Sequence, residues 1–289
     1  TQVGSQVGST IISDGGTIYL REESGSIEYS FDNSSYATIT SWPVTIENTN
    51  PGSSNVTTVQ LTENMTLSNT TGGTGSSGTD VYFICGSEYI TFDGQNNTIT
   101  IKDISNWLGM IENGNGDVNT IIKTGFSNIT VKNINVLSDN SSMSPDASTV
   151  DSGGWLCRSH YGNSITGGSL RIENCTSNGN IGFLEGGLIG PRMCIVAKDF
   201  TLNISECSSS GIISTTDNYG GGGIIGYRAF QQIENGTITV SECYSTGIIS
   251  GQFSGGIFGT GGGYQMSDGS ISVSECYSTG IISGQFSGG

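Results

Sequence analysis

With 289 residues, the chain is long enough for one elongated domain or two globular ones, but its hydrophobic content of 34% is low for a globular core. The formal net charge of −16, with only nine Lys and Arg residues, disfavours nucleic acid and anionic membranes as partners. No apolar run approaches the ~18 residues of a membrane-spanning helix, so we expect no membrane insertion. The 46 glycines suit either disorder or a solenoid with a thin core.

The first half of the chain reads as irregular strands. Residues 1–16 show no pattern and are predicted to form an N-terminal arm or cap. Polar loops are expected at 68–80 and 138–152, where Gly, Ser, Thr and Asn dominate. Outside these loops, short apolar runs and apolar–polar alternation predict strands at 18–20, 37–39, 44–46, 59–61, 65–67 and 81–85.

The segment 89–101 is more informative. It predicts a strand, a turn at Asp93-Gly94 and a second strand. The run 108–111 then resembles a degenerate form of a glycine motif that recurs later in the chain. We therefore interpret 17–152 as irregular turns of one continuous solenoid.

The second half is a tandem repeat. A Gly-Gly pair precedes a short apolar run at Gly153, Gly186, Gly222 and Gly255 and recurs at Gly288, with spacings of 33, 36, 33 and 33 residues. The units are thus 153–185, 186–221, 222–254 and 255–287. Residues 238–256 and 271–289 differ only at Thr239 and Ser272. Because 289 has the phase of 256, we expect the array to continue or to pair with another subunit.

Each unit also contains a strand that bends before a cysteine. In 238–243, apolar and polar residues alternate to Val240, two polar residues follow, and Cys243 restores the inward phase. With the segment after the cysteine and the Gly-Gly run, a unit offers three short strands. The predicted fold is all-β: a single-stranded, right-handed parallel β-helix (β-solenoid) with three strands per ~33-residue rung. We find no helical periodicity.

Stacking the units predicts two columns of side chains. The interior column is predicted to contain Ile134, Cys175, Cys207, Cys243 and Cys276, mainly as packed, reduced thiols. Cys157 and Cys194 lie off this column and can pair with each other, and the absence of a C-x-x-C pair disfavours a zinc site. An acidic corner file is predicted to contain Glu206, Glu242 and Glu275, for which an exposed row without metal is favoured over a calcium site.

The candidate chemistry is sparse. The aspartates are scattered without an adjacent pair, whereas carbohydrate hydrolysis needs two carboxyl groups at a defined separation. His160 is the only histidine, with Arg158 and Asp151 nearby, and a structural loop histidine is the favoured interpretation over a site. We predict no catalytic residues, no metal and no cofactor, so the protein is expected not to be an enzyme.

Ten N-x-S/T sequons mark candidate glycosylation sites, which matter only if the protein meets a glycosylation machinery. These are Asn33, Asn55, Asn64, Asn69, Asn96, Asn128, Asn140, Asn174, Asn203 and Asn235.

Two stretches carry a resemblance to known families. The phrase ITFDGQNNTITI followed by NITVKNINV resembles right-handed parallel β-helices of the pectin-lyase-like group. The units CYSTGIISGQFSGGIFG and GGLIG resemble GLUG-type repeats of bacterial surface adhesins and of surface proteins of giant viruses that infect amoebae. The resemblance implies a solenoid, and it leaves the activity open because this fold carries both enzymes and inert fibres.

Three functions follow as hypotheses. The first is a structural surface protein, a fibre or shaft outside a cell or on a virion, that associates with itself head-to-tail. The second is an adhesin that binds host glycans in a groove lined by Tyr244, Phe253, Tyr264, Tyr277 and Phe286. The third is a polysaccharide lyase or hydrolase. An ice-binding solenoid is disfavoured because no Thr-x-Thr column repeats through the units.

Overall fold

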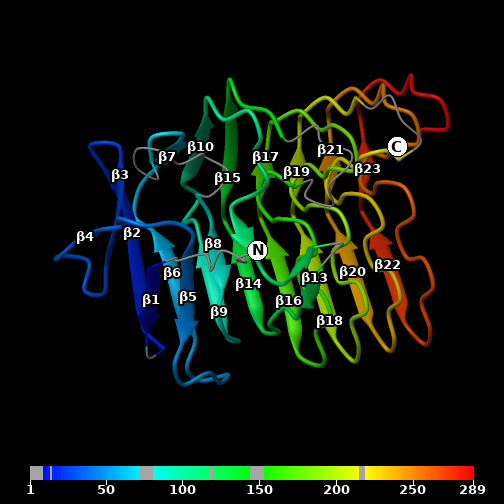
Figure 1. Cartoon of the computed structure of the whole chain (residues 1–289). Coiled ribbons are helices and arrows are strands. Elements are labelled where there is room, and N and C mark those ends of the chain that lie inside the picture. The colour runs from blue at the N-terminus through cyan, green and yellow to red at the C-terminus, as the bar shows by residue number, and fades with distance from the viewer. Residues whose placement is uncertain (1–8, 14, 72–80, 118–119, 144–152, 215–218) are drawn as a thin grey trace.

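A computed structural model describes residues 9–13, 15–71, 81–117, 120–143, 153–214 and 219–289. In these residues the chain forms strands and turns without helices, and its parallel sheets stack as a β-solenoid (Figure 1). The predicted all-β solenoid is therefore confirmed. No described segment forms a helix with the length and hydropathy needed to cross a membrane.

The longest sheet runs the full length of the solenoid, from blue to red in Figure 1. Its eight parallel strands follow the chain in order, because each turn places one strand beside the equivalent strand of the turn before. They are β2 (Thr17–Glu23), β6 (Thr57–Leu61), β9 (Ile90–Asp93), β14 (Ile129–Lys132), β16 (Ser169–Glu173), β18 (Thr201–Ser205), β20 (Thr237–Ser241) and β22 (Ser270–Ser274).

The strands of the second sheet each follow a strand of the longest sheet, from β6 onward, after a corner in the chain. This sheet contains β7 (Met65–Ser68), β10 (Thr98–Lys102), β15 (Asn135–Asp139), β17 (Thr176–Ser177), β19 (Ser208–Ser209), β21 (Tyr244–Ser245) and β23 (Tyr277–Ser278). The third sheet contains β1 (Ser9–Ser13), β5 (Val44–Asn48), β8 (Phe83–Cys85) and β11 (Ile111–Glu112). β1 lies within the segment expected to be an arm and pairs with β5. A separate antiparallel pair joins β12 (Asn115–Asp117) and β13 (Thr120–Lys123).

The expected third strand of each regular unit is not a strand. After residue 153 the Gly-Gly runs are joined only by isolated bridges, such as Gly186 to Gly222 and Ile189 to Ile225. Two successive amides, those of Leu188 and Ile189, donate to the same carbonyl of Ile224. A pleated strand directs successive amides to opposite sides, so the run bends here and forms a corner.

The Gly-Gly pair lets two walls of the solenoid approach closely. A Cβ on Gly223 would overlap the carbonyl oxygen of Gly256 and lie 2.7 Å from the Cβ and Oγ of Ser245. Ser245 belongs to a buried inward column of the second sheet, with Ser177 and Ser209. Small side chains therefore face glycines across the core in each of these turns.

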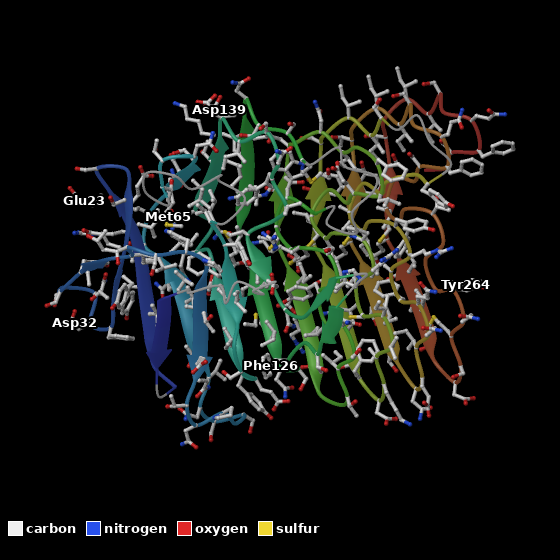
Figure 2. The ribbon with its side chains drawn as sticks, viewed as in Figure 1. Glu23, Asp32, Met65, Phe126, Asp139 and Tyr264 are labelled. Atoms are coloured by element: carbon white, nitrogen blue, oxygen red, sulfur yellow. The ribbon has the colours of Figure 1, made fainter. Side chains whose placement is uncertain are left out.

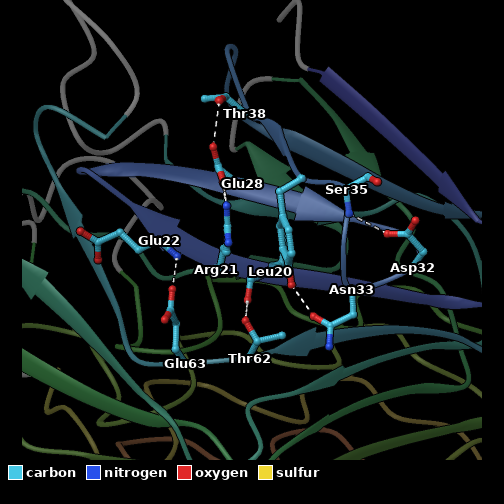
Figure 3. A network of polar contacts seen from close by, with 11 residues as sticks. Leu20, Arg21, Glu22, Glu28, Asp32, Asn33, Ser35, Thr38, Thr62 and Glu63 are labelled. Atoms are coloured by element: carbon cyan, nitrogen blue, oxygen red, sulfur yellow. Dashed lines mark hydrogen bonds and ion pairs between the residues drawn. The ribbon is translucent and has the colours of Figure 1, made fainter.

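The N-terminal edge of the longest sheet is covered rather than open. After β2 the chain turns at Ser24 and Gly25, both with left-handed backbone, and returns as β3 (Ser26–Ser30), which pairs antiparallel with β2. β4 (Ala37–Thr38) then pairs with β3. Figure 3 shows the polar contacts here: Arg21 donates from Nε and Nη2 to Glu28 Oε2, at 2.9 and 2.8 Å.

The segment that follows each Gly-Gly run, called here the wide segment, covers residues 160–164, 192–196, 228–232 and 261–265. The sequence did not predict its backbone conformation. Every second residue has a positive φ, and the amides bond alternately to the next turn and to the preceding one. Inter-turn hydrogen bonds thus offset a conformation that is unfavourable for most L-residues. These residues are His160, Gly162 and Ser164; Arg192, Cys194 and Val196; Arg228, Phe230 and Gln232; and Gly261, Gly263 and Gln265.

Candidate functional site

The structure aligns the five members of the interior column. The residue after each member pairs with the equivalent residue of the next turn. The successive pairs are Asn135 with Thr176, Thr176 with Ser208, Ser208 with Tyr244, and Tyr244 with Tyr277. The side chains of Ile134, Cys175, Cys207 and Cys243 are almost completely buried, whereas Cys276 is partly exposed in the last turn.

The corner geometry suits a thiol at this position. Each Sγ lies within hydrogen-bond range of the carbonyl two residues earlier, at 3.3 Å for Cys175, 3.2 Å for Cys207, 3.1 Å for Cys243 and 3.3 Å for Cys276. The adjacent Cys207 thiol, together with burial, holds the pKa of Cys243 well above its usual value. The Cys243 thiol is therefore a protonated packing group at neutral pH.

All seven cysteines are free thiols. The suggested pairing of Cys157 with Cys194 is therefore wrong for this structure. Both side chains are fully buried, and burial raises the pKa of each thiol.

The acidic corner file lies at the surface. Glu206, Glu242 and Glu275 are exposed and share a left-handed backbone conformation, with φ of 55°, 54° and 55°. Asn133 and Asn174 occupy the same corner in the two preceding turns, and Asn174 Nδ2 donates to Asn133 Oδ1 at 2.9 Å. No cluster of metal-binding side chains occurs in the described part of the chain.

The sequons are accessible where the structure describes them. Asn33, Asn64, Asn69, Asn96, Asn140, Asn174 and Asn235 are exposed, and Asn55, Asn128 and Asn203 are half-buried. Asn174 is also part of the corner ladder, so a glycan on its Nδ2 would compete with the bonds to Asn133 and to Asn96 Oδ1.

The only histidine is buried. His160 is 2% exposed, and burial, aided by the charge of Arg192, lowers its pKa to about 4, so its ring is neutral at physiological pH. Its expected neighbour Asp151 lies outside the described residues. Arg158 instead lies 3.6 Å from Glu112 Oε2 and stacks over the ring of Tyr82.

Asp93 does more than form the turn expected for it. It is 6% exposed, its Oδ1 accepts hydrogen bonds from Asn133 Nδ2 and the Gln95 amide, and Lys132 lies 3.2 Å from its Oδ2. These partners outweigh the opposing effect of burial and lower its pKa. A fully engaged carboxylate of this kind supports the corner between β9 and β10.

The five aromatic residues proposed to line one groove are divided between two stacks and a loop. Tyr244 stacks on Tyr277 with ring centroids 5.3 Å apart and planes within 6°. Phe253 stacks on Phe286 at 5.0 Å, and Tyr264 lies in the wide segment of the last turn, where it is 55% exposed (Figure 2). Face-to-face stacking covers one face of each paired ring.

A groove lies instead on the outer face of the second sheet. It has a volume of about 460 Å³, and of the five aromatic residues only Tyr244 lines it. One outward column shows why it forms: Asn135, Thr176, Ser208 and Tyr244 follow one another in register, so a small serine precedes a large tyrosine. The groove is lined by Thr98, Asn135, Val136, Leu137, Thr176, Ser177, Asn178, Ser208, Ser209, Ser210, Tyr244 and Thr246.

Hydrogen bonds hold the polar wall of this groove in place. Thr176 Oγ1 donates to Asn135 Oδ1 at 2.9 Å, and Asn178 Oδ1 accepts from the Ser138 amide at 2.7 Å. The groove therefore offers oriented hydroxyl and amide groups beside one aromatic ring. The change from a small to a large residue at this position is visible in the sequence and could have predicted the groove. The residues that directly follow the column cysteines are Thr176, Ser208, Tyr244 and Tyr277.

Comparison with known proteins adds no relative: no family model, curated protein or solved structure matches the chain.

Proposed function

We propose that this protein is a structural surface protein whose solenoid forms a fibre or shaft outside a cell or on a virion. The observation that carries the proposal is the register: near-identical units stack directly on one another, β20 on β22 and β21 on β23, around one continuous core. Each added unit lengthens such a structure without requiring a new interface. The exposed sequons support a surface role, and the resemblance of the repeats to GLUG-type units of surface proteins is part of the same proposal.

Imaging the native material tests this proposal. Negative-stain micrographs of the source cells or particles, labelled with an antibody to this chain, are expected to show elongated projections at the surface. Label confined to compact particles inside the cell would contradict it.

The second candidate function is glycan binding, and the groove beside Tyr244 favours it. A neutral sugar ring above Ser208 would meet the face of Tyr244 that Tyr277 leaves uncovered, with Asn135, Thr176 and Asn178 within the same groove. Aromatic stacking with a few oriented polar groups is a common way to hold a small ligand.

The two tyrosines provide a matched pair of variants. If a glycan array identifies a ligand, Tyr244→Ala is expected to weaken its binding about tenfold, because the stacking surface is lost. Tyr277→Ala removes the same side chain from outside the groove and is expected to change the affinity less than about threefold. Calorimetry on both variants measures this, and equal losses would argue against the groove.

A further inference from the structure

Three successive wide segments carry a basic column, defined here as His160, Arg192 and Arg228. The amide of His160 donates to the carbonyl of the residue before Arg192, and the amide of Arg192 donates to the carbonyl of the residue before Arg228. All three have a left-handed backbone, with φ of 59°, 59° and 51°. Residues that are far apart in the sequence therefore have equivalent positions in neighbouring turns, about 4.8 Å apart along the solenoid.

No acidic group of the described residues neutralises the two arginines. Arg21, Arg158 and Arg171 each lie within ion-pair distance of a glutamate, but Arg192 and Arg228 have no such partner there. Acids are not scarce, because the chain has 25 Asp and Glu residues against nine Lys and Arg. Burial lowers the pKa of Arg192, and the charge of Arg228 acts in the same direction, so the two cations lie near each other.

The next turn leaves this column accessible. Gly261 has the equivalent position there, and a Cβ on it would lie 3.2 Å from Arg228 Cγ. Arg228 is exposed, and Arg192 is half-buried. The guanidinium of Arg228 lies over the ring of Tyr227, with its Cζ 5.0 Å from the ring centroid. This contact limits the movement of the guanidinium but does not use the N–H donors at its edge.

The imidazole of His160 supplies a second, independent observation. It is 2% exposed, and its Nδ1 has no hydrogen-bond partner in the described part of the chain. The charge of Arg192, added to burial, lowers the pKa of His160, so the ring is neutral at physiological pH and lies near this guanidinium. A buried polar atom without a partner is unfavourable. An oxygen atom bound beside Arg192 would supply the missing partner.

We propose that Arg192 and Arg228 bind a tetrahedral oxyanion, a sulfate or phosphate group, beside the ring of His160. The planar donors of a guanidinium match two oxygens of such a group, so arginines in neighbouring turns can hold it from two sides. None of the three residues lines the groove beside Tyr244. The inference therefore rests on this column alone and not on the proposed surface role or on binding in that groove.

The test follows anion binding to the full chain by NMR. His160 is the only histidine, so its ring signals report on this site without ambiguity. Sodium sulfate is expected to shift these signals until the site is saturated. Sodium chloride at the same ionic strength controls for screening and should cause a small shift without saturation. Equal responses to sulfate and chloride would overturn the proposal.

Two arginine substitutions separate the site from general attraction. Arg228→Gln is expected to weaken sulfate binding at least about tenfold, because charge-assisted hydrogen bonds are lost. Arg171→Gln removes the same charge from an exposed arginine that pairs with Glu173, and the affinity should stay within about twofold. Circular dichroism checks that both variants keep the fold, which is expected because both side chains are exposed. Equal losses in the two variants would contradict the proposed site.

A sulfated oligosaccharide and its desulfated form then distinguish the source of the group. If the sulfated form binds more than about tenfold more tightly than free sulfate, the group belongs to a glycan. Similar affinities would instead assign the site to a free ion. Binding of the desulfated form as tight as that of the sulfated form would show that the arginines do not recognise the anion.

Discussion

Gly223→Ala is expected to destabilise the solenoid by about 3 kcal/mol, a large loss for a single methyl group. The added Cβ would overlap the carbonyl oxygen of Gly256 in the next turn and press on Ser245 across the core. The Gly256 carbonyl and the Ser245 side chain are both fixed by the pairing of neighbouring turns. The steric overlap can therefore be removed only if the two walls of the solenoid move apart. The free energy of unfolding, measured by urea denaturation of both proteins, checks this expectation.

Gly262→Ala is the matched control. Gly262 also lies in a turn of the repeat region, its φ is not positive, and its nearest neighbour to a new Cβ is a Phe258 ring carbon at 3.8 Å. This substitution is expected to change stability by less than about 0.5 kcal/mol. If both variants lose the same stability, the cost comes from replacing glycine as such and not from the close approach of two walls.

Glu185→Gln is expected to change how stability depends on pH. Glu185 is 2% exposed, and its Oε2 accepts a hydrogen bond from the Gly182 amide. Burial raises its pKa to about 8, against an ordinary value of 4.5, and the Gly182 amide only partly opposes this rise. The folded protein therefore keeps a proton on this carboxyl group at neutral pH, whereas the unfolded chain does not.

The sign of the effect follows from this proton. As pH rises from about 4.5 to 8, the unfolded chain loses the proton while the folded state retains it, so the wild type loses stability across this window and no further above it. The stability of Glu185→Gln relative to wild type should therefore grow by an amount on the order of 4 kcal/mol between these limits. Chemical denaturation at several pH values measures the difference.

An exposed acid serves as the control for this experiment. Glu206→Gln makes the same substitution at a surface side chain, where a single exposed charge contributes little to the free energy of unfolding, so the variant should stay within about 0.5 kcal/mol of the wild type. A Glu185→Gln profile parallel to that of the wild type would mean that water or a rearranged loop solvates the carboxylate in the folded protein.

Several features were predictable because they depend on short-range pattern. The alternation before each cysteine and the phase slip at two polar residues correctly indicated a strand, a corner and a second strand, seen as β20 and β21. The Gly-Gly spacing correctly indicated stacked turns. It did not indicate that the Gly-Gly run bends, because a corner and a short buried strand both appear as a brief apolar run in the sequence.

The candidate site was less predictable, since it depends on neighbours in space. Tyr244 and Tyr277 have equivalent positions in the repeat, and their rings stack on each other. Tyr244 lines the groove because the small Ser208 lies beside it in the preceding turn, whereas Tyr277 does not line the groove. Glu185 shows the same dependence. Gly221, Ser254 and Ser287 occupy its position in later turns, and no local pattern indicates that its carboxyl group is buried.

By itself, the sequence determined the repeat length, the inward positions and hence the parallel stacking, because the side-chain period of a strand and identical units leave few other ways to bury these residues. Only the tertiary structure decided the antiparallel cover over β2, the left-handed corners, the position of the groove and the protonation of Glu185. Each of these depends on which group of a neighbouring turn lies opposite, and hydrogen bonding and desolvation are set by that contact rather than by residue type.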